Sequence, residues 1–289
     1  MLSYKSKYFV LIIIMVFQTS CETNVENVEL PEFLQKLVIT SFISPSDTVS
    51  YFSVSSNKKL YGELNTEEPL GNLVGYISDG ENEVTLDTFR TGFKLKHDIM
   101  QIQYGKTYHL RISSVKGLSC EAYCTVPEKM NFNMKVDTFS IPLPYDWAME
   151  KRRIDIKISI QDIPGTENYY RIFSKGIGYY KDPYNFESYS STNFLYFENE
   201  LISDNGMDGK EIVQKSLSGI NYYFQHDSAY IVAYLFNTER SYFLYHKSLK
   251  DYKNGENPFS EATPVFSNIN GGLGIFTSYT VDSLVMRLK

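Results

Sequence analysis

Among the residues that could carry chemistry, Cys21 stands in the most informative place. Lys5 and Lys7 precede an apolar run over residues 8–17, and Gln18-Thr19-Ser20 lead directly to the cysteine. A positive segment, a short apolar segment and small residues before a cleavage point are typical of a signal peptide. As a helix the apolar run reaches about 15 Å, which is too short for a hydrocarbon core of roughly 30 Å. We therefore predict that residues 1–20 are a lipoprotein signal peptide and that Cys21 takes the lipid.

The alternative is an ordinary secretory peptide with an incidental cysteine, because Gln18 stands where a lipobox usually has leucine. Thr19 and Ser20 favour the lipoprotein. Removing residues 1–20 takes two lysines from the 28 basic residues and leaves 26 against 34 acidic residues, a net charge of −8. A negative chain disfavours binding to nucleic acid or to anionic headgroups. We expect acyl chains to hold the protein to a membrane.

The other two cysteines, Cys120 and Cys124, lie in a run that predicts a strand over residues 118–126. Positions four apart in a strand are roughly 13 Å apart, whereas a disulfide needs Cα atoms within about 7 Å. We expect two buried free thiols, with a disulfide as the alternative if a turn breaks the strand. Buried thiols among apolar neighbours are inert, so we do not expect a cysteine nucleophile.

The histidines do not form a recognisable catalytic pattern. None belongs to the two-histidine helical pair of a zinc hydrolase, and no serine lies in a G-x-S-x-G elbow. We expect His109 on a strand surface and His246 packed beside a helix. The four residues are His97, His109, His226 and His246. The sequence predicts no catalytic residue and no enzyme; a cryptic hydrolase is the remaining enzymatic alternative.

One acidic, glycine-containing segment could resemble a calcium loop. Its spacing does not match the EF-hand pattern, so a hairpin with solvated acids is the preferred interpretation. The oxygen-bearing residues are Asp204, Asn205, Asp208 and Glu211. Gly271-Gly272-Leu273-Gly274 is not a dinucleotide fingerprint, because Thr277 stands where the third glycine is needed and a strand follows. We predict no metal and no cofactor.

The elements that must position these residues are mainly strands. The chain contains 24 Tyr and 19 Phe but one Trp, a composition that favours sheet. After a tether over residues 21–35, short strands closed by Pro127 predict an immunoglobulin-like or transthyretin-like β-sandwich over residues 36–128. Asp79-Gly80 signals a hairpin turn in it. The expected strands are residues 37–43, 48–55, 73–78, 83–86, 108–113 and 118–126.

A second β-rich domain is predicted over residues 129–289. Residues 154–160 alternate apolar and polar, which predicts a strand with one wet face. Thr238 can cap a helix over residues 238–253, whose apolar stripe would be Tyr242, Tyr245, Leu249 and Tyr252. The other expected strands are residues 169–180, 194–197, 211–214, 230–236 and 279–288. The predicted fold is thus mainly β, a sandwich followed by a β-rich domain with one helix.

Aromatic residues crowd one stretch of this second domain, around Asp182-Pro183. Tyrosine gives large contact area at low entropy cost and keeps a hydroxyl for hydrogen bonding, which suits a recognition surface. Strand packing, which tyrosine also favours, is the alternative. The candidate recognition residues are Tyr179, Tyr180, Tyr184, Phe186 and Tyr189.

Several blocks resemble a known family. They are residues 36–43, residues 76–80, residues 104–112, residues 203–210, and the terminal block of Asn257-Pro258-Phe259 with residues 263–276. The terminal block is the most specific. On these blocks the chain, from Cys21 to its end, resembles the Bacteroidota lipoprotein family catalogued as domain of unknown function 4249 (DUF4249).

The resemblance implies an outer-membrane lipoprotein, often encoded beside a TonB-dependent receptor, with no established activity or catalytic residues. We accordingly expect a non-enzymatic, lipid-anchored protein of the outer membrane that binds or supports a TonB-dependent transporter. The sequence leaves open its ligand and the face of the membrane on which it lies. A structural or adhesive surface protein, with the sandwich as a spacer, is the alternative of another class.

Overall fold

The computed structural model describes residues 32–58, 69–128, 134–142, 152–182, 184, 186–217, 220–222, 228–254 and 264–288. The predicted signal peptide, Cys21, His226 and Asn257-Pro258-Phe259 lie outside these ranges. The fold below is that of the compact unit Gln35–Lys289. Within the described ranges no helix has the length and apolar character needed to cross a membrane.

The first part of this unit is a β-sandwich, as predicted. One layer has the strand order β4-β3-β7-β8, and the other contains β1, β2, β6 and β5. Buried side chains from both layers form one apolar core, among them Ile39, Phe52, Ile77, Tyr108 and Leu110. The strands are β1 (Leu37–Ile43), β2 (Val49–Ser56), β3 (Leu73–Ser78), β4 (Glu83–Thr85), β5 (Asp87–Phe89), β6 (Gly92–Lys96), β7 (Thr107–Ser114) and β8 (Ser119–Thr125).

The second part is also a sandwich. A sheet centred on β10 packs against a layer that contains β11, β12, β13 and β16, and a second apolar core lies between them. Ile156, Ile158 and Ile160 of β10 point into this core. The strands are β9 (Met134–Pro142), β10 (Arg152–Gln161), β11 (Tyr169–Lys181), β12 (Ser188–Leu195), β13 (Leu201–Ser203), β14 (Glu211–Lys215), β15 (Ile220–Tyr222) and β16 (Ser228–Thr238).

The other face of β10 is less wet than predicted. Asp155 and Ser159 on that face are buried, and Lys157 is half-buried. The reason is that β10 is a central strand, paired with β9 on one side and with β14 and β15 on the other. Alternation alone does not distinguish a central strand from an edge strand.

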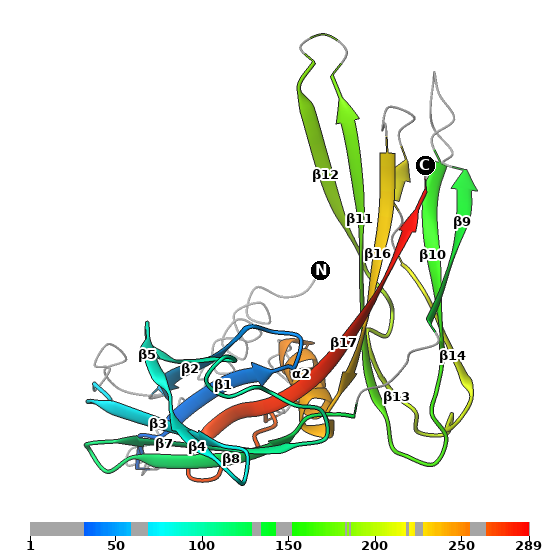
Figure 1. Cartoon of the computed structure of the whole chain (residues 1–289). Helices are drawn as coiled ribbons and strands as arrows, with labels where there is room; N and C mark the ends of the chain where they lie inside the picture. The colour runs from blue at the N-terminus through cyan, green and yellow to red at the C-terminus, as the bar shows by residue number, and fades with distance from the viewer. Residues whose placement is uncertain are drawn as a thin grey trace, which may run out of the picture. The chain divides into compact units, whose positions relative to one another are not determined.

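One long strand, β17 (Leu273–Arg287), belongs to both sandwiches (Figure 1). Its first half pairs in parallel with β1, and its second half pairs antiparallel with β16. The result is a sheet of nine strands that runs through both parts. Gly274 permits this pairing: its φ is 102°, and a Cβ there would stand 2.0 Å from the carbonyl oxygen of Ile39. The two strand sets that the sequence separates at residue 128 therefore share their last strand.

The helix α2 (Arg240–Asn254) packs near the middle of β17 and also contacts β11 and β13. It begins two residues later than predicted, because Thr238 ends β16 and its hydroxyl donates to the carbonyl oxygen of Tyr169. Glu239 takes the cap position, and its carbonyl oxygen accepts from the Phe243 N–H. Tyr242 of the predicted stripe is buried, but Tyr252 at the far end is exposed.

Candidate functional site

The predicted recognition residues lie on the hairpin of β11 and β12, and β12 is an edge strand of the nine-stranded sheet (Figure 1). Tyr184 is 92% exposed, Phe186 69%, Tyr179 46% and Tyr189 38%. Tyr184 and Phe186, beside the turn, are therefore accessible to a partner, as a recognition surface requires. Pro183 and the side chain of Tyr180 lie outside the described part of the chain. We call the four exposed residues the aromatic hairpin.

The connection between the two strands holds its aromatic side chains outward. A carboxylate oxygen of Asp182 accepts from the Tyr184 N–H at 2.7 Å, and the Asp182 carbonyl oxygen accepts from the Phe186 N–H at 2.9 Å. Phe186 has a φ of 61°, a left-handed conformation that is uncommon for a residue with a bulky side chain. The ammonium of Lys181 lies over its ring, 5.6 Å from the centroid. The loop thus fixes an apolar ring at an exposed position.

Below the hairpin, the outer side of the sheet carries a further aromatic surface that the sequence analysis did not identify. Register places outward residues of β11, β12, β16 and β17 in rows, with Phe194 beside Lys175 and Val232 beside Val285. No acidic residue stands at an outward position in the described parts of these four strands. We define the aromatic sheet face as Phe173, Lys175, Ile177, Tyr179, Phe194, Tyr230, Val232, Tyr234 and Val285.

Ring contacts occur in two groups on this face, and strand pairing places the groups on neighbouring positions of β11 and β16. Phe173 lies 5.7 Å from Phe194 and 5.8 Å from Tyr234 between ring centroids, and Tyr179 meets Tyr230 edge to face. The Lys175 ammonium lies over Tyr234 at 5.7 Å. The sequence of β16 contains a pattern that could have predicted this face. Its inward residues Ala229, Ile231, Ala233 and Leu235 alternate with outward aromatic and valine residues. A strand that is apolar on both faces either has both faces buried or exposes one face as a contact surface.

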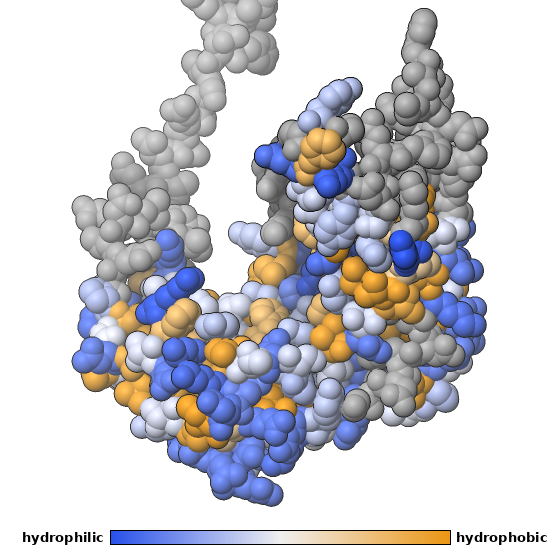
Figure 2. All heavy atoms as spheres, turned by 45° about the horizontal axis from the view of Figure 1, so that its top comes forward, coloured by the Kyte–Doolittle hydropathy of each residue, from blue (hydrophilic) through white to orange (hydrophobic). Residues whose placement is uncertain are grey.

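Apolar residues also reach the surface elsewhere. Figure 2 shows them on one face of the molecule as several separate groups with polar residues between them. Tyr123 and Tyr252 are exposed single aromatics of this kind. Scattered apolar residues are ordinary on protein surfaces, whereas contiguous ones mark contact sites. The aromatic hairpin and the aromatic sheet face are contiguous along β11.

The fold brings a serine and a histidine into contact, although no sequence motif predicted this pair. Ser50 Oγ lies 2.8 Å from Nε2 of His97, and the carboxylate of Asp47 is close enough to influence the imidazole. Burial lowers the pKa of His97, and Asp47 opposes this shift. Ser50 is 1% exposed because β2 turns it towards the core. A nucleophile without access to solvent cannot meet a substrate, so the pair connects β2 to the end of β6.

The other described histidines lie where the sequence placed them. His109, on a strand surface, bonds Glu121 at 2.9 Å and stacks on Tyr123 with 4.1 Å between ring centroids. His246 stacks on Phe42 at 5.5 Å beside the helix stripe. Burial, and then the nearby charge of Arg171, lower the pKa of His246 to about 4, so this imidazole is neutral at pH 7.

Cys120 and Cys124 are free and buried on one strand, as expected. Burial raises the pKa of Cys120 to about 11 and that of Cys124 well above its ordinary value. Since the thiolate is the reactive form, neither thiol is activated.

Three acids come together at the end of β10. Oxygens of Asp162, Asp204 and Asp208 all lie within 4.8 Å of one another, so this group could hold a cation such as Ca²⁺. The sequence analysis identified Asp204 and Asp208 but missed Asp162, which is distant along the chain. The two oxygens of Asp162 accept from the Tyr170 hydroxyl at 2.7 Å and the Gly209 N–H at 2.8 Å. These bonds give the acids a structural role in closing the loop.

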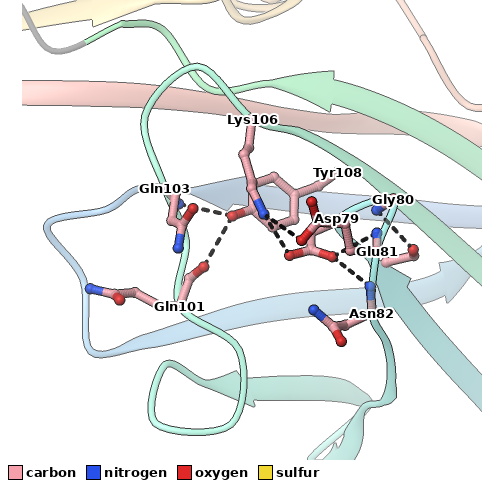
Figure 3. A network of polar contacts seen from close by, with 9 residues as sticks. Asp79, Gly80, Glu81, Asn82, Gln101, Gln103, Lys106 and Tyr108 are labelled. Atoms are coloured by element: carbon pink, nitrogen blue, oxygen red, sulfur yellow. Dashed lines mark hydrogen bonds and ion pairs between the residues drawn. The ribbon is translucent and has the colours of Figure 1, made fainter.

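The predicted turn at Asp79-Gly80 is also a polar network (Figure 3). One oxygen of Asp79 accepts from the N–H groups of Glu81 and Asn82, and the other pairs with Lys106 at 3.0 Å. Hydrogen bonding to Asn82, and then to Lys106, lowers the pKa of Asp79 to about 2. Beside it, the Tyr108 hydroxyl accepts from the Gln103 N–H and donates to the Gln101 carbonyl. Two of the sequence blocks that suggested the family, residues 76–80 and 104–112, are thus connected by this network at one end of the first sandwich.

The geometry defines a β protein of two sandwiches joined by a shared strand, with a contiguous aromatic surface on the second. The chain belongs to the DUF4249 family, described as a domain of unknown function, whose profile matches residues 23–284. The match covers nearly the whole chain and bears out the resemblance. No curated protein matches the chain.

Proposed function

We propose that this protein is a non-enzymatic, lipid-anchored lipoprotein of the outer membrane that binds a partner protein through the aromatic hairpin and the aromatic sheet face. The observation that carries the proposal is the run of outward aromatic residues along β11 and its neighbours, from the exposed Tyr184 and Tyr179 to the half-buried Tyr234. A TonB-dependent transporter is the partner that the family resemblance suggests.

A protein partner suits the chemistry of this surface. Tyrosine and phenylalanine are enriched in the centres of interfaces, where a few rings supply most of the binding energy. Valine and isoleucine add apolar area with no hydrogen-bonding groups of their own. Lys175 is an outward cation, and no outward acid opposes it in the described strands, so the complementary surface is apolar with acidic groups at its edge.

The anchor supports the same proposal. With Cys21 lipidated and a negatively charged body, the chain would stay at a membrane through its acyl chains and not through headgroup contacts. A partner in the same membrane then meets the aromatic surface at high effective concentration.

Affinity capture of the intact, lipidated protein from detergent-solubilised outer membranes tests the proposal. A Tyr184→Ala/Phe186→Ala variant should fold normally and lose the co-purifying transporter, with each hot-spot ring contributing about 2 kcal/mol. Tyr252→Ala is the matched control, because this exposed tyrosine lies outside the surface. Recovery of the same transporter with the double variant would reject the surface.

A second measurement addresses the anchor. Cys21→Ser should abolish incorporation of labelled palmitate and release the protein into the soluble fraction. If the variant still takes up palmitate and stays with membranes, the lipobox interpretation is wrong.

A further inference from the structure

A second surface feature lies on the first sandwich, at the open edge formed by β5. A pocket of about 430 Å³ opens on the outer side of β2, β6 and β5. Its walls include Tyr51, Phe89 and Arg90, and Ser53 and Thr91 also line it. The volume is within the range of small-molecule sites and suits a single ring with its substituents. We call it the β5 pocket.

Glycine creates the hollow. Register places Gly92 between Ser53 of β2 and Phe89 of β5. A Cβ at this position would stand 2.0 Å from the carbonyl oxygen of Phe52, so the close approach of the two strands excludes every side chain. The outer side of the sheet therefore has no side chain between Ser53 and Phe89, and this gap forms the floor of the pocket.

Two cations converge on the aromatic wall. The guanidinium of Arg90 lies 5.2 Å, and the ammonium of Lys94 5.5 Å, from the centroid of the Phe89 ring. The rings of Phe89 and Tyr51 are 5.2 Å apart. In the described part of the chain neither cation belongs to an ion pair; the acid nearest in register is Asp87, opposite Lys94.

A pocket on the other layer of the same sandwich provides the contrast. There Arg111 lies over Tyr76, 5.7 Å from the ring centroid, in a similar cation–ring arrangement. Its charge is already paired with Glu83. The first pocket thus offers positive charge to a ligand, and the second does not.

The backbone at Arg90 gives an independent indication. This residue has a φ of 51°, in the left-handed region where glycine or asparagine is unstrained. If this position served only to form the turn, glycine or asparagine would suffice, and the long cationic side chain of Arg90 would not be needed. Non-glycine residues held in this conformation concentrate at functional sites.

We propose that the β5 pocket binds a carboxylate-bearing sugar ring, of the uronic acid class. The Tyr51 and Phe89 rings contact the apolar face of the sugar, and the hydroxyls of Ser53 and Thr91 bond its hydroxyl groups. The planar guanidinium of Arg90 binds the carboxylate with two parallel bonds. Lys94 does not line the pocket, but its ammonium lies over the Phe89 ring and adds positive charge beside it. This site lies on the first sandwich and does not depend on the aromatic surface of the second.

Saturation-transfer NMR and calorimetry with the full-length protein test this site. Glucuronate should bind saturably, and glucose, which lacks the carboxylate, at least 10-fold more weakly. Arg90→Gln and Lys94→Gln should each weaken glucuronate binding at least 5-fold, whereas Arg111→Gln, the matched control, should leave it unchanged. A disaccharide with a terminal glucuronate distinguishes the source: tighter binding than free glucuronate indicates the end of a polysaccharide, and equal binding a free sugar acid.

Arg90→Gly separates binding from folding. Glycine relieves the backbone conformation, so the melting temperature should stay the same or rise while glucuronate binding is lost. The proposal is overturned if the wild type does not prefer glucuronate to glucose, or if Arg90→Gly binds as the wild type does.

Discussion

The outer faces of the two sandwiches have opposite chemistry. On the first, outward residues of β7 and β8 satisfy one another, as in the His109–Glu121 hydrogen bond and the stacking of His109 on Tyr123. On the second, outward residues of β11 and β16 are rings and branched aliphatic side chains such as Phe173 and Val232. The first face needs no partner, whereas the second leaves apolar surface that a partner could cover. The self-satisfied face thus belongs to the four-stranded layer β4-β3-β7-β8, whereas the apolar face belongs to the nine-stranded sheet.

Truncation before Pro264 should have the largest effect on both parts. It removes Ile269 and Phe276 from the first core and the neighbours Leu284 and Met286 from the second. We expect loss of the cooperative unfolding transition in circular dichroism and collapse of the dispersed amide NMR spectrum. Truncation after Thr280 is the control, because it keeps the pairing of β17 with β1 and should spare the first sandwich. An unchanged first sandwich after the longer truncation would show that residues 36–128 fold alone.

Phe276→Ala and Tyr234→Ala compare a core ring with a ring of the aromatic sheet face. Phe276 is fully buried, so its truncation should lower the free energy of unfolding by about 3–5 kcal/mol. Tyr234 is half-buried on the outer side, and its truncation should cost about 1 kcal/mol or less. Urea denaturation measures both. Equal losses would mean that the outer rings are packing residues and not a contact surface.

Glu239→Ala should have an intermediate effect at the junction of the two sandwiches. Its carboxylate accepts from the Thr125 N–H of β8, from Ser241 of α2 and from the Thr277 hydroxyl of β17. Leaving these donors without an acceptor should cost about 1–3 kcal/mol in urea denaturation. Asp251→Ala, at an exposed position on the same helix, is the control. No difference between the two variants would exclude a role for Glu239 at the junction.

The smallest effect concerns pH and the first sandwich. The pKa of Asp79 is lowered from 3.8 to about 2, so its contribution is complete above pH 4 and is lost as pH falls towards 2. Because the turn is near solvent, we expect about 1 kcal/mol. Asp79→Asn should be less stable than the wild type at pH 6 and should show a flatter decline between pH 4 and 2. A wild-type and variant decline of equal slope would assign the acid sensitivity to other carboxylates.

Sequence periodicity identified the strands that carry clear alternation and missed those without it. The limits of β1 and β3 agree with the prediction to the residue. Short or polar strands such as β5, β13 and β15 have too few residues for a pattern. The strand expected over residues 194–197 is wrong in extent: β12 covers Ser188–Leu195, because its serine-rich part is exposed on both faces and lacks alternation.

Glycine caused another error, at the start of β17. The glycines from Gly271 to Gly274 suggested an interruption of regular structure, so the last strand was expected to begin only at Tyr279. In fact Gly274 lies within β17, where its missing side chain lets the strand approach β1. Such a requirement depends on a strand that is remote in the sequence, and local patterns do not contain it.

The candidate sites also divide into those whose residues are neighbours in the sequence and those whose residues are brought together by the fold. The aromatic hairpin was predictable because its residues are neighbours in the sequence. The aromatic sheet face needs the register of four strands. Asp162 joins Asp204, and Ser50 joins His97, only through the fold. Residues that are brought together by pairing of remote strands have no spacing that a motif could encode.

The place of β17 after every other strand of the two sandwiches has a consequence for synthesis. During elongation from the N-terminus, β1 to β8 are made early, yet β1 lacks its parallel neighbour, and the first core lacks Ile269 and Phe276, until β17 has been made. We therefore expect this chain to depart from the usual order, in which an N-terminal domain folds while the rest is still being made. We expect both sandwiches to complete their folding only after residues 273–287 have been made.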